Sequence, residues 1–121
     1  MNEPERIRRA LEEAPHAPGA VAARGFAQGL DVEVPIALRD ATFPQNDGAF
    51  VLRVRNGQGE LIRGGSGDVR LPIGGFASLY TGWASTAMLR RAGRLAGGSD
   101  VHCAALDAAF AGPTPWLVDE F

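Results

Sequence analysis

The chain has 121 residues, of which 45% are hydrophobic and 21% are charged, and its formal net charge is −2. This length and composition are typical of one soluble globular domain, and no apolar stretch reaches the roughly 18 residues that a membrane span requires. The slightly negative charge argues against nucleic acid as the main partner, and the twelve basic residues, all arginines, are spread along the chain as on a solvated surface.

The N-terminal residues are charged throughout. Oppositely charged side chains four residues apart predict a helix over residues 3–14, but its apolar stripe is thin. We therefore interpret residues 1–17 as a lead-in or linker helix and residues 18–121 as the domain itself. Pro15, Pro18 and Gly19 are expected to break this helix, and residues 20–24 to form one or two further helical turns. A charged start is unlike a signal peptide, and a lone cysteine makes no internal disulfide, so we expect a cytoplasmic protein.

Four strands are expected next. Apolar and polar residues alternate over residues 30–38, which predicts a strand with one buried face. Pro35 has no N–H to donate, so this strand is expected at a sheet edge or at a bulge. The turn residues 56–59 predict a hairpin, and the remaining strands are expected over residues 49–55, 60–63 and 68–71, with a flexible glycine-rich joint at residues 64–67.

Helical patterns fill the rest of the chain. Helices are expected over residues 73–80, 84–92 and 101–110, and Ser99 or Asp100 caps the last of them. Strands first and helices later predict an α+β domain, with a mostly antiparallel sheet and helices packed on one of its faces.

Few residues suggest metal or nucleophilic chemistry. His16, His102 and Cys103 are the soft ligands, and no two histidines have a ligand spacing, so no metal site is predicted. Cys103 lies among alanines in the middle of a helix, which is typical of a small buried thiol. The glycine-rich residues 94–99 are nearly the loop that holds coenzyme A in GNAT acetyltransferases, but no strand precedes them, and we interpret them as a helix C-cap and turn.

An aromatic stripe offers a candidate ligand site. The spacings of three and four residues place Phe76, Leu79, Tyr80 and Trp83 on one helical face. Such stripes are primarily core packing. The alternative interpretation is the wall of an apolar cavity between the helices and the sheet.

The last residues of the chain are unusually apolar. Leaving Trp116, Leu117, Val118 and Phe121 in water would cost roughly 1.5 to 3 kcal/mol each relative to burial, so we expect the terminus to be docked. The α-carboxylate of a docked Phe121 would be an anion at a defined position, and Glu120 adds a second negative charge. The terminus is therefore either a structural clamp or half of a site.

Four segments in order resemble one family: residues 36–50, residues 68–71, residues 76–94 in part, and residues 106–110 with Pro115, Trp116 and the terminal Phe121. Together they are similar to the C-terminal domain of the enhanced intracellular survival (Eis-like) N-acetyltransferases, over residues 18–121. The resemblance implies a sterol-carrier-protein-like fold, in which helices back a sheet.

The resemblance also implies a role. In that family two GNAT regions precede this domain and bind acetyl-coenzyme A, and the terminal aromatic residue supplies its carboxylate as a base for the substrate amine. Phe121 would be that base, and Glu120 would help to hold a cationic amine such as a polyamine or an aminoglycoside. This chain has no room for the GNAT regions and is expected to hold no cofactor itself. It would be an accessory domain, inactive alone, whose partners are GNAT domains in cis or in trans.

Two other hypotheses stay open. The chain could be a stand-alone module that binds a sterol, a lipid or another small apolar ligand in a cavity lined by Phe76, Leu79, Tyr80 and Trp83. It could also be a structural domain that forms a homo-oligomer and binds nothing.

Overall fold

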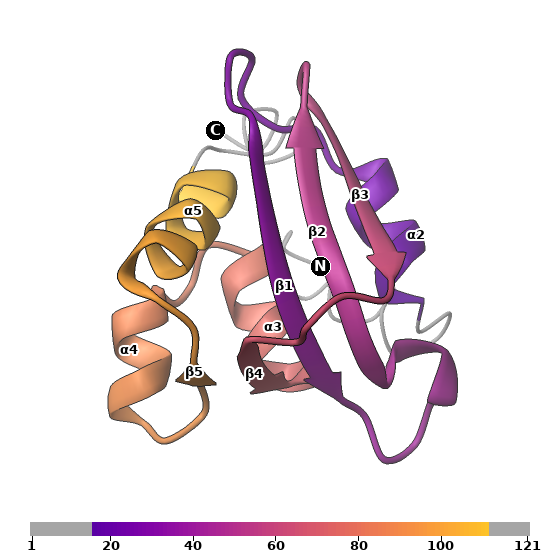
Figure 1. Ribbon diagram of the computed structural model, residues 1–121, viewed down its shortest axis with the longest axis vertical. Helices are drawn as coiled ribbons and strands as arrows, with labels where there is room; N and C mark the ends of the chain where they lie inside the picture. The colour runs from indigo at the N-terminus through magenta and orange to yellow at the C-terminus, as the bar shows by residue number, and fades with distance from the viewer. Residues whose placement is uncertain (1–15, 112–121) are drawn as a thin grey trace, which may run out of the picture.

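The computed structural model describes residues 16–111, which form a five-stranded sheet covered by helices on one face (Figure 1). The strand order is β3-β2-β1-β4-β5, and every neighbouring pair is antiparallel except β1 and β4. The α+β prediction with a mostly antiparallel sheet is confirmed. In chain order the elements are α2 (Ala17–Ala23), β1 (Val32–Arg39), the 3-10 turn η1 (Pro44–Asn46), β2 (Gly48–Arg55), β3 (Gln58–Arg63), β4 (Val69–Pro72), α3 (Ile73–Tyr80), α4 (Thr86–Arg91), β5 (Ala96–Gly97) and α5 (Asp100–Ala111).

The predicted alternation along the strands sets the core. Every second side chain of β1 and β2 is buried on the face that α2, α3 and α5 cover: Val34, Ile36 and Leu38 on β1, and Phe50, Leu52 and Val54 on β2. A strand of period two that faces helices on one side buries one set of side chains and exposes the other. The opposite face of the sheet carries both polar and apolar side chains, including the Glu33–Arg53 ion pair.

The expectation that Pro35 marks an edge strand is wrong, because β1 lies in the middle of the sheet. Pro35 pairs with Val51 of β2, while β4 pairs with β1 only from Ile36 onwards. The proline therefore lies just beyond the end of the β1–β4 ladder, where a missing N–H costs no bond to β4. Whether Pro35 is tolerated in a central strand depends on where β4 begins to pair with β1, and the local sequence around Pro35 does not predict that point.

The connection between β3 and β4 crosses the uncovered face of the sheet (Figure 1). The end of β3 and the start of β4 lie in one row of paired residues, which is Arg63, Phe50, Ile36 and Val69. Residues 64–68 bridge that row directly, and close approach requires glycine there. A Cβ on Gly65 would lie 2.7 Å from Val51, and one on Gly67 would lie 3.2 Å from Ala37. The segment expected to be a flexible joint is thus packed against the strands.

Serine side chains cap the starts of α4 and α5. Ser85 caps α4 by accepting from the N–H of Met88, and Ser99 accepts from the N–H of His102 in the first turn of α5, as predicted. The short helix expected over residues 20–24 starts earlier, because α2 begins at Ala17 and Pro18 lies in its first turn, where no N–H is needed. β5 was not predicted, since two residues are too short for a periodic pattern. The helix expected over residues 3–14 lies outside the described residues.

A polar network joins the start of α2 to the loop between β1 and β2. Asp40 accepts hydrogen bonds from the N–H groups of Thr42 and Phe43, both at 3.0 Å, and from the side-chain amide of Asn46 at 3.1 Å. Asn46 in turn accepts from the N–H of Ala17 at 2.7 Å. Burial alone would raise the pKa of Asp40, but these three bonds outweigh it and hold the pKa below its usual value. The carboxylate thus stays charged and fixes the loop to α2.

Candidate functional site

A buried arginine surrounded by three aromatic rings lies where α2 ends. Arg24 is only 3% exposed. Its guanidinium carbon lies 4.9 Å from the ring centre of Phe26, 5.2 Å from that of Phe110 and 5.5 Å from that of Tyr80. All three distances are within the range of favourable cation–π contact. We call these four residues the Arg24 cluster.

Local geometry brings the first half of the cluster together. Arg24 has an extended backbone that ends α2, and its guanidinium donates to the carbonyl of Gly25 at 3.0 Å. Phe26 then donates its N–H to the carbonyl of Gly57, in the turn between β2 and β3. A Cβ on Gly59 would lie 2.3 Å from the Phe26 ring, so glycine at that position of β3 makes room for the ring.

Phe110 connects the second half of the cluster to the core. Its ring centre lies 5.9 Å from Phe26, 5.9 Å from Phe76 in an edge-on arrangement and 6.1 Å from Tyr80. The Tyr80 hydroxyl donates to the carbonyl of Ala20 at 2.8 Å. Burial raises the pKa of Tyr80 to about 12, although the positive charge of Arg24 opposes the shift. Tyr80 is therefore a neutral donor that ties α3 to α2.

The Arg24 cluster corrects the interpretation of the arginines as a solvated surface. Burial lowers the pKa of Arg24, with the Tyr80 phenol acting in the opposite direction. A guanidinium nonetheless stays protonated at neutral pH, so a positive charge is held inside the domain. The residues that surround it come from positions far apart in the chain, and no local pattern marks them.

α5 ends beside this cluster, because Phe110 belongs to both. The helix ends at Ala111, one residue after Phe110. Residues 112–121, which include the predicted site residues Glu120 and Phe121, lie outside the described residues. The described part of the chain ends one residue after Phe110, whose ring contacts Arg24.

The stripe of four apolar residues is divided by the end of α3. Phe76, Leu79 and Tyr80 are at most 2% exposed and belong to the core, whereas Trp83 is 61% exposed. The helix ends at Tyr80, and the turn that follows carries Trp83 away from the helical face. Burial of the first three agrees with the core interpretation, and the structure does not bring Trp83 together with them.

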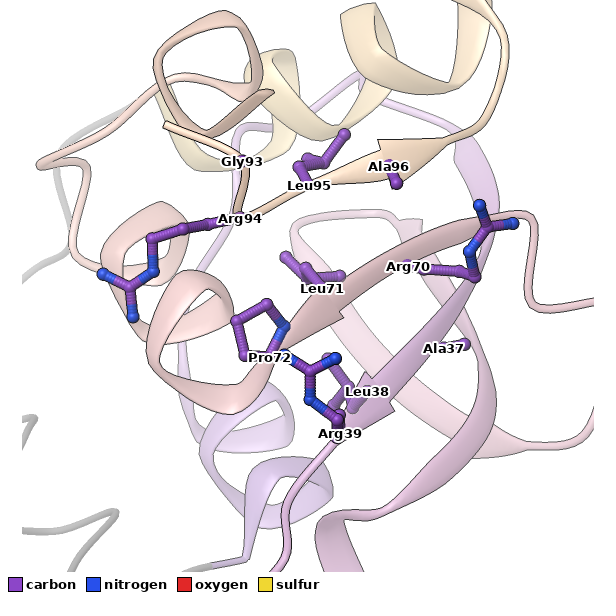
Figure 2. A pocket seen from close by; sticks show the side chains of 10 residues that line it. All are labelled: Ala37, Leu38, Arg39, Arg70, Leu71, Pro72, Gly93, Arg94, Leu95 and Ala96. Carbon is purple, nitrogen blue, oxygen red and sulfur yellow. The ribbon is translucent and has the colours of Figure 1, made fainter. Parts of the chain in front are cut away.

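A pocket of about 320 Å³ lies away from the Arg24 cluster, beside the end of β4 that leads into α3 (Figure 2). Its lining comes from β1, from β4 and from residues 93–96, which lead into β5. It includes three arginines, Arg39, Arg70 and Arg94. Sequence reasoning did not identify this site, because the three arginines are far apart in the chain.

The two histidines and the cysteine each contact neighbouring polar groups of the fold. His16 caps α2 by accepting from the N–H of Gly19 at 2.9 Å, and His102 lies 3.9 Å from the carboxylate of Asp68. Cys103 is half-buried, and Arg90 approaches its sulfur to 3.4 Å. Within residues 16–111 no group of three or more His, Cys, Asp or Glu side chains is arranged to hold a metal ion. No helix in that same part of the chain is long and apolar enough to cross a membrane.

Comparison with known proteins supplies the context. The sterol carrier protein domain family matches residues 17–118. The GCN5-related N-acetyltransferase of Kribbella flavida is 42% identical, with a TM-score of 0.75 over 82% of this chain and 26% of that protein. The enzyme of the same type from Anabaena variabilis is 33% identical, with a TM-score of 0.76 over 83% and 26%. Eis1 of Mycobacterium abscessus is 25% identical, with a TM-score of 0.64 over 80% and 24%. No curated protein sequence matches significantly.

Proposed function

The chain belongs to the sterol carrier protein domain family, and from this we propose that it acts as the C-terminal accessory domain of an Eis-like N-acetyltransferase. One observation carries the proposal: the chain spans only about a quarter of the solved acetyltransferases that it resembles, while they cover most of the chain. A chain with this coverage would correspond to one domain of a larger enzyme. In that enzyme the GNAT regions would bind acetyl-coenzyme A and the amine would enter between the domains.

The chemical contribution of this chain would be its terminal carboxylate. An α-carboxyl group has a reference pKa of about 3.3 to 3.7, so it is ionised at neutral pH and can attract a cationic amine. Phe121 would accept the proton that the ammonium group must lose before its nitrogen attacks the acetyl carbonyl, and Glu120 would add negative charge beside it. The packing of Phe110 on Phe76 supports this role, because it fixes the end of α5, ten residues before Phe121 in the sequence.

Association with a GNAT region tests the proposal directly. The 121-residue chain would be titrated into the Kribbella flavida enzyme from which the matched domain has been removed, with binding followed by calorimetry. We expect saturable binding, because the truncated enzyme exposes the surface that its own domain normally covers. The intact Kribbella flavida enzyme is the matched control and is expected not to bind, since that surface is occupied.

Two outcomes would count against the accessory role. The first is a folded chain that binds the truncated and intact enzymes equally, or neither of them. The second is a rise in the melting temperature of the isolated chain on addition of a sterol or a phospholipid, without binding to the truncated enzyme. A ligand that binds only the native state stabilises it by mass action, so this second result would favour the stand-alone apolar-ligand module.

A further inference from the structure

The pocket in Figure 2 carries a positive charge that the described residues do not neutralise. Arg39, Arg70 and Arg94 line it, and no carboxylate does. None of these three guanidinium groups forms a hydrogen bond or an ion pair with any residue from 16 to 111. We call this feature the arginine pocket.

Strand register explains why the pocket is hollow. Arg39 lies opposite Pro72 in the β1–β4 ladder, and Arg70 lies between Ala37 and Ala96. Long side chains thus alternate with small ones on the same face of the sheet, and the small residues Ala37 and Ala96 line the hollow between the long ones. Figure 2 shows Arg70 at one end of the pocket and Arg39 towards the end where β4 leads into α3.

The first turn of α3 adds to the positive potential. Pro72 precedes this helix, and no side chain caps its N-terminus. The Arg94 guanidinium lies against this turn, because a Cβ on Gly74 would be 2.9 Å from its Nη2 atom. The unpaired N–H groups of a helix start and the helix dipole both favour an anion. An arginine beside them acts in the same direction.

Other arginines show how this chain usually satisfies the guanidinium group. Arg53 and Arg55 pair with Glu33, with shortest distances of 2.8 and 3.5 Å. Arg63 donates to backbone carbonyls of the β1–β2 loop, and Arg90 donates to the carbonyl of Gly97. Asp40, which follows Arg39 in the sequence, is already used by the loop network described above. The three pocket arginines have no such partner, and among residues 16–111 they share this only with the exposed Arg91.

We propose that the arginine pocket binds a phosphate-type oxyanion carried by a small molecule. Guanidinium groups are suited to such anions because they donate paired N–H bonds to two oxygens at once. The volume of about 320 Å³ lies at the lower end of the range for ligand pockets, which is about 300 to 1,000 Å³. A concave site of this size is better suited to a small anionic ligand than to the flat surface of a partner protein. The proposal does not depend on the acetyltransferase role.

Calorimetric titration of the 121-residue chain with pyrophosphate tests this site, with inorganic phosphate as a second arm and sodium chloride at equal ionic strength as the blank. We expect saturable binding of pyrophosphate, weakened about tenfold in Arg94→Gln by the loss of one charge-assisted contact. Arg91→Gln is the matched control. Arg91 is an exposed arginine that does not line the pocket and has no side-chain partner among the described residues. Its affinity is expected to stay within about twofold of the parent chain, since only long-range charge is lost.

Three results would overturn the proposal. The first is the absence of saturable heat with both phosphate and pyrophosphate. The second is an equal loss of affinity in Arg94→Gln and Arg91→Gln, which would indicate general attraction of anions to a charged surface. The third is an unchanged affinity in Arg94→Gln and in Arg39→Gln. Equal binding of the two ligands would indicate that one phosphate group is the recognised unit, and tighter binding of pyrophosphate would extend the site towards Arg70. Thermal unfolding of each variant confirms that the fold is retained.

Discussion

Adding one glycine after Phe121 is expected to lower kcat/KM about 100-fold or more in an enzyme that uses this chain as its last domain. The test enzyme is a chimera in which this chain replaces the matched domain of the Kribbella flavida acetyltransferase, which is 42% identical to it. The extra residue moves the carboxylate by about 3.8 Å and leaves a neutral amide in its place. A general base misplaced by far less loses most of its effect.

The matched control for this extension is Phe121→Leu in the same chimera. It changes the terminal side chain but keeps the carboxylate at the same position in the chain, so its kcat/KM is expected to fall by no more than about tenfold. Both variants should unfold at the temperature of the parent chimera. Full activity of the extended chimera would show that the terminal carboxylate takes no part in acetyl transfer.

Truncating Phe110 to alanine is expected to cost about 3 to 5 kcal/mol in the free energy of unfolding. The ring is 3% exposed and contacts the rings of Phe26, Phe76 and Tyr80 as well as the Arg24 guanidinium. Its loss leaves a cavity between α3 and α5 and removes one wall of the Arg24 cluster. Urea denaturation of the 121-residue chain measures the change.

Trp83→Ala is the comparison for Phe110→Ala. It removes a larger aromatic ring, but one that is 61% exposed. Its expected cost is about 0.5 kcal/mol or less, in line with other surface positions. Similar costs for the two variants would show that the Arg24 cluster contributes little to the fold.

Local sequence patterns were sufficient for most of the elements. The alternation in β1 and β2 predicted which side chains are buried, because a strand that faces helices on one side needs only a period of two. The predicted bounds of α3 are confirmed, and the hydroxyl of Ser99 caps α5 as expected. Such features depend on residues within one or two turns of each other.

Features that depend on distant partners were missed. Pro35 could not reveal that β4 pairs with β1 from the next residue onwards, and two residues of β5 carry no period. Arg24 looked like a surface residue because its rings come from α3, α5 and the segment before β1. The arginine pocket likewise assembles side chains from three separate strands or loops. In each example strand order or helix packing decides the outcome.

The candidate site was predicted only in part. The burial of Phe76, Leu79 and Tyr80 followed from their spacing, but the spacing rule does not extend to Trp83, which lies beyond the end of α3. The assignment of Glu120 and Phe121 as site residues rests on the apolar character of the terminus and on the family resemblance. Their roles stay proposals.

We propose that this chain completes an acetyltransferase, and the rate of acetyl transfer by the chimera tests that proposal. The Kribbella flavida enzyme without its matched domain is the reference, with acetyl-coenzyme A as donor and a polyamine or an aminoglycoside as acceptor. We expect the chimera to transfer acetyl groups and the truncated enzyme to be at least about 100-fold slower, because the truncated enzyme lacks the domain whose last residue, Phe121, carries the proposed base. A folded chimera that is no faster than the truncated enzyme would contradict the account.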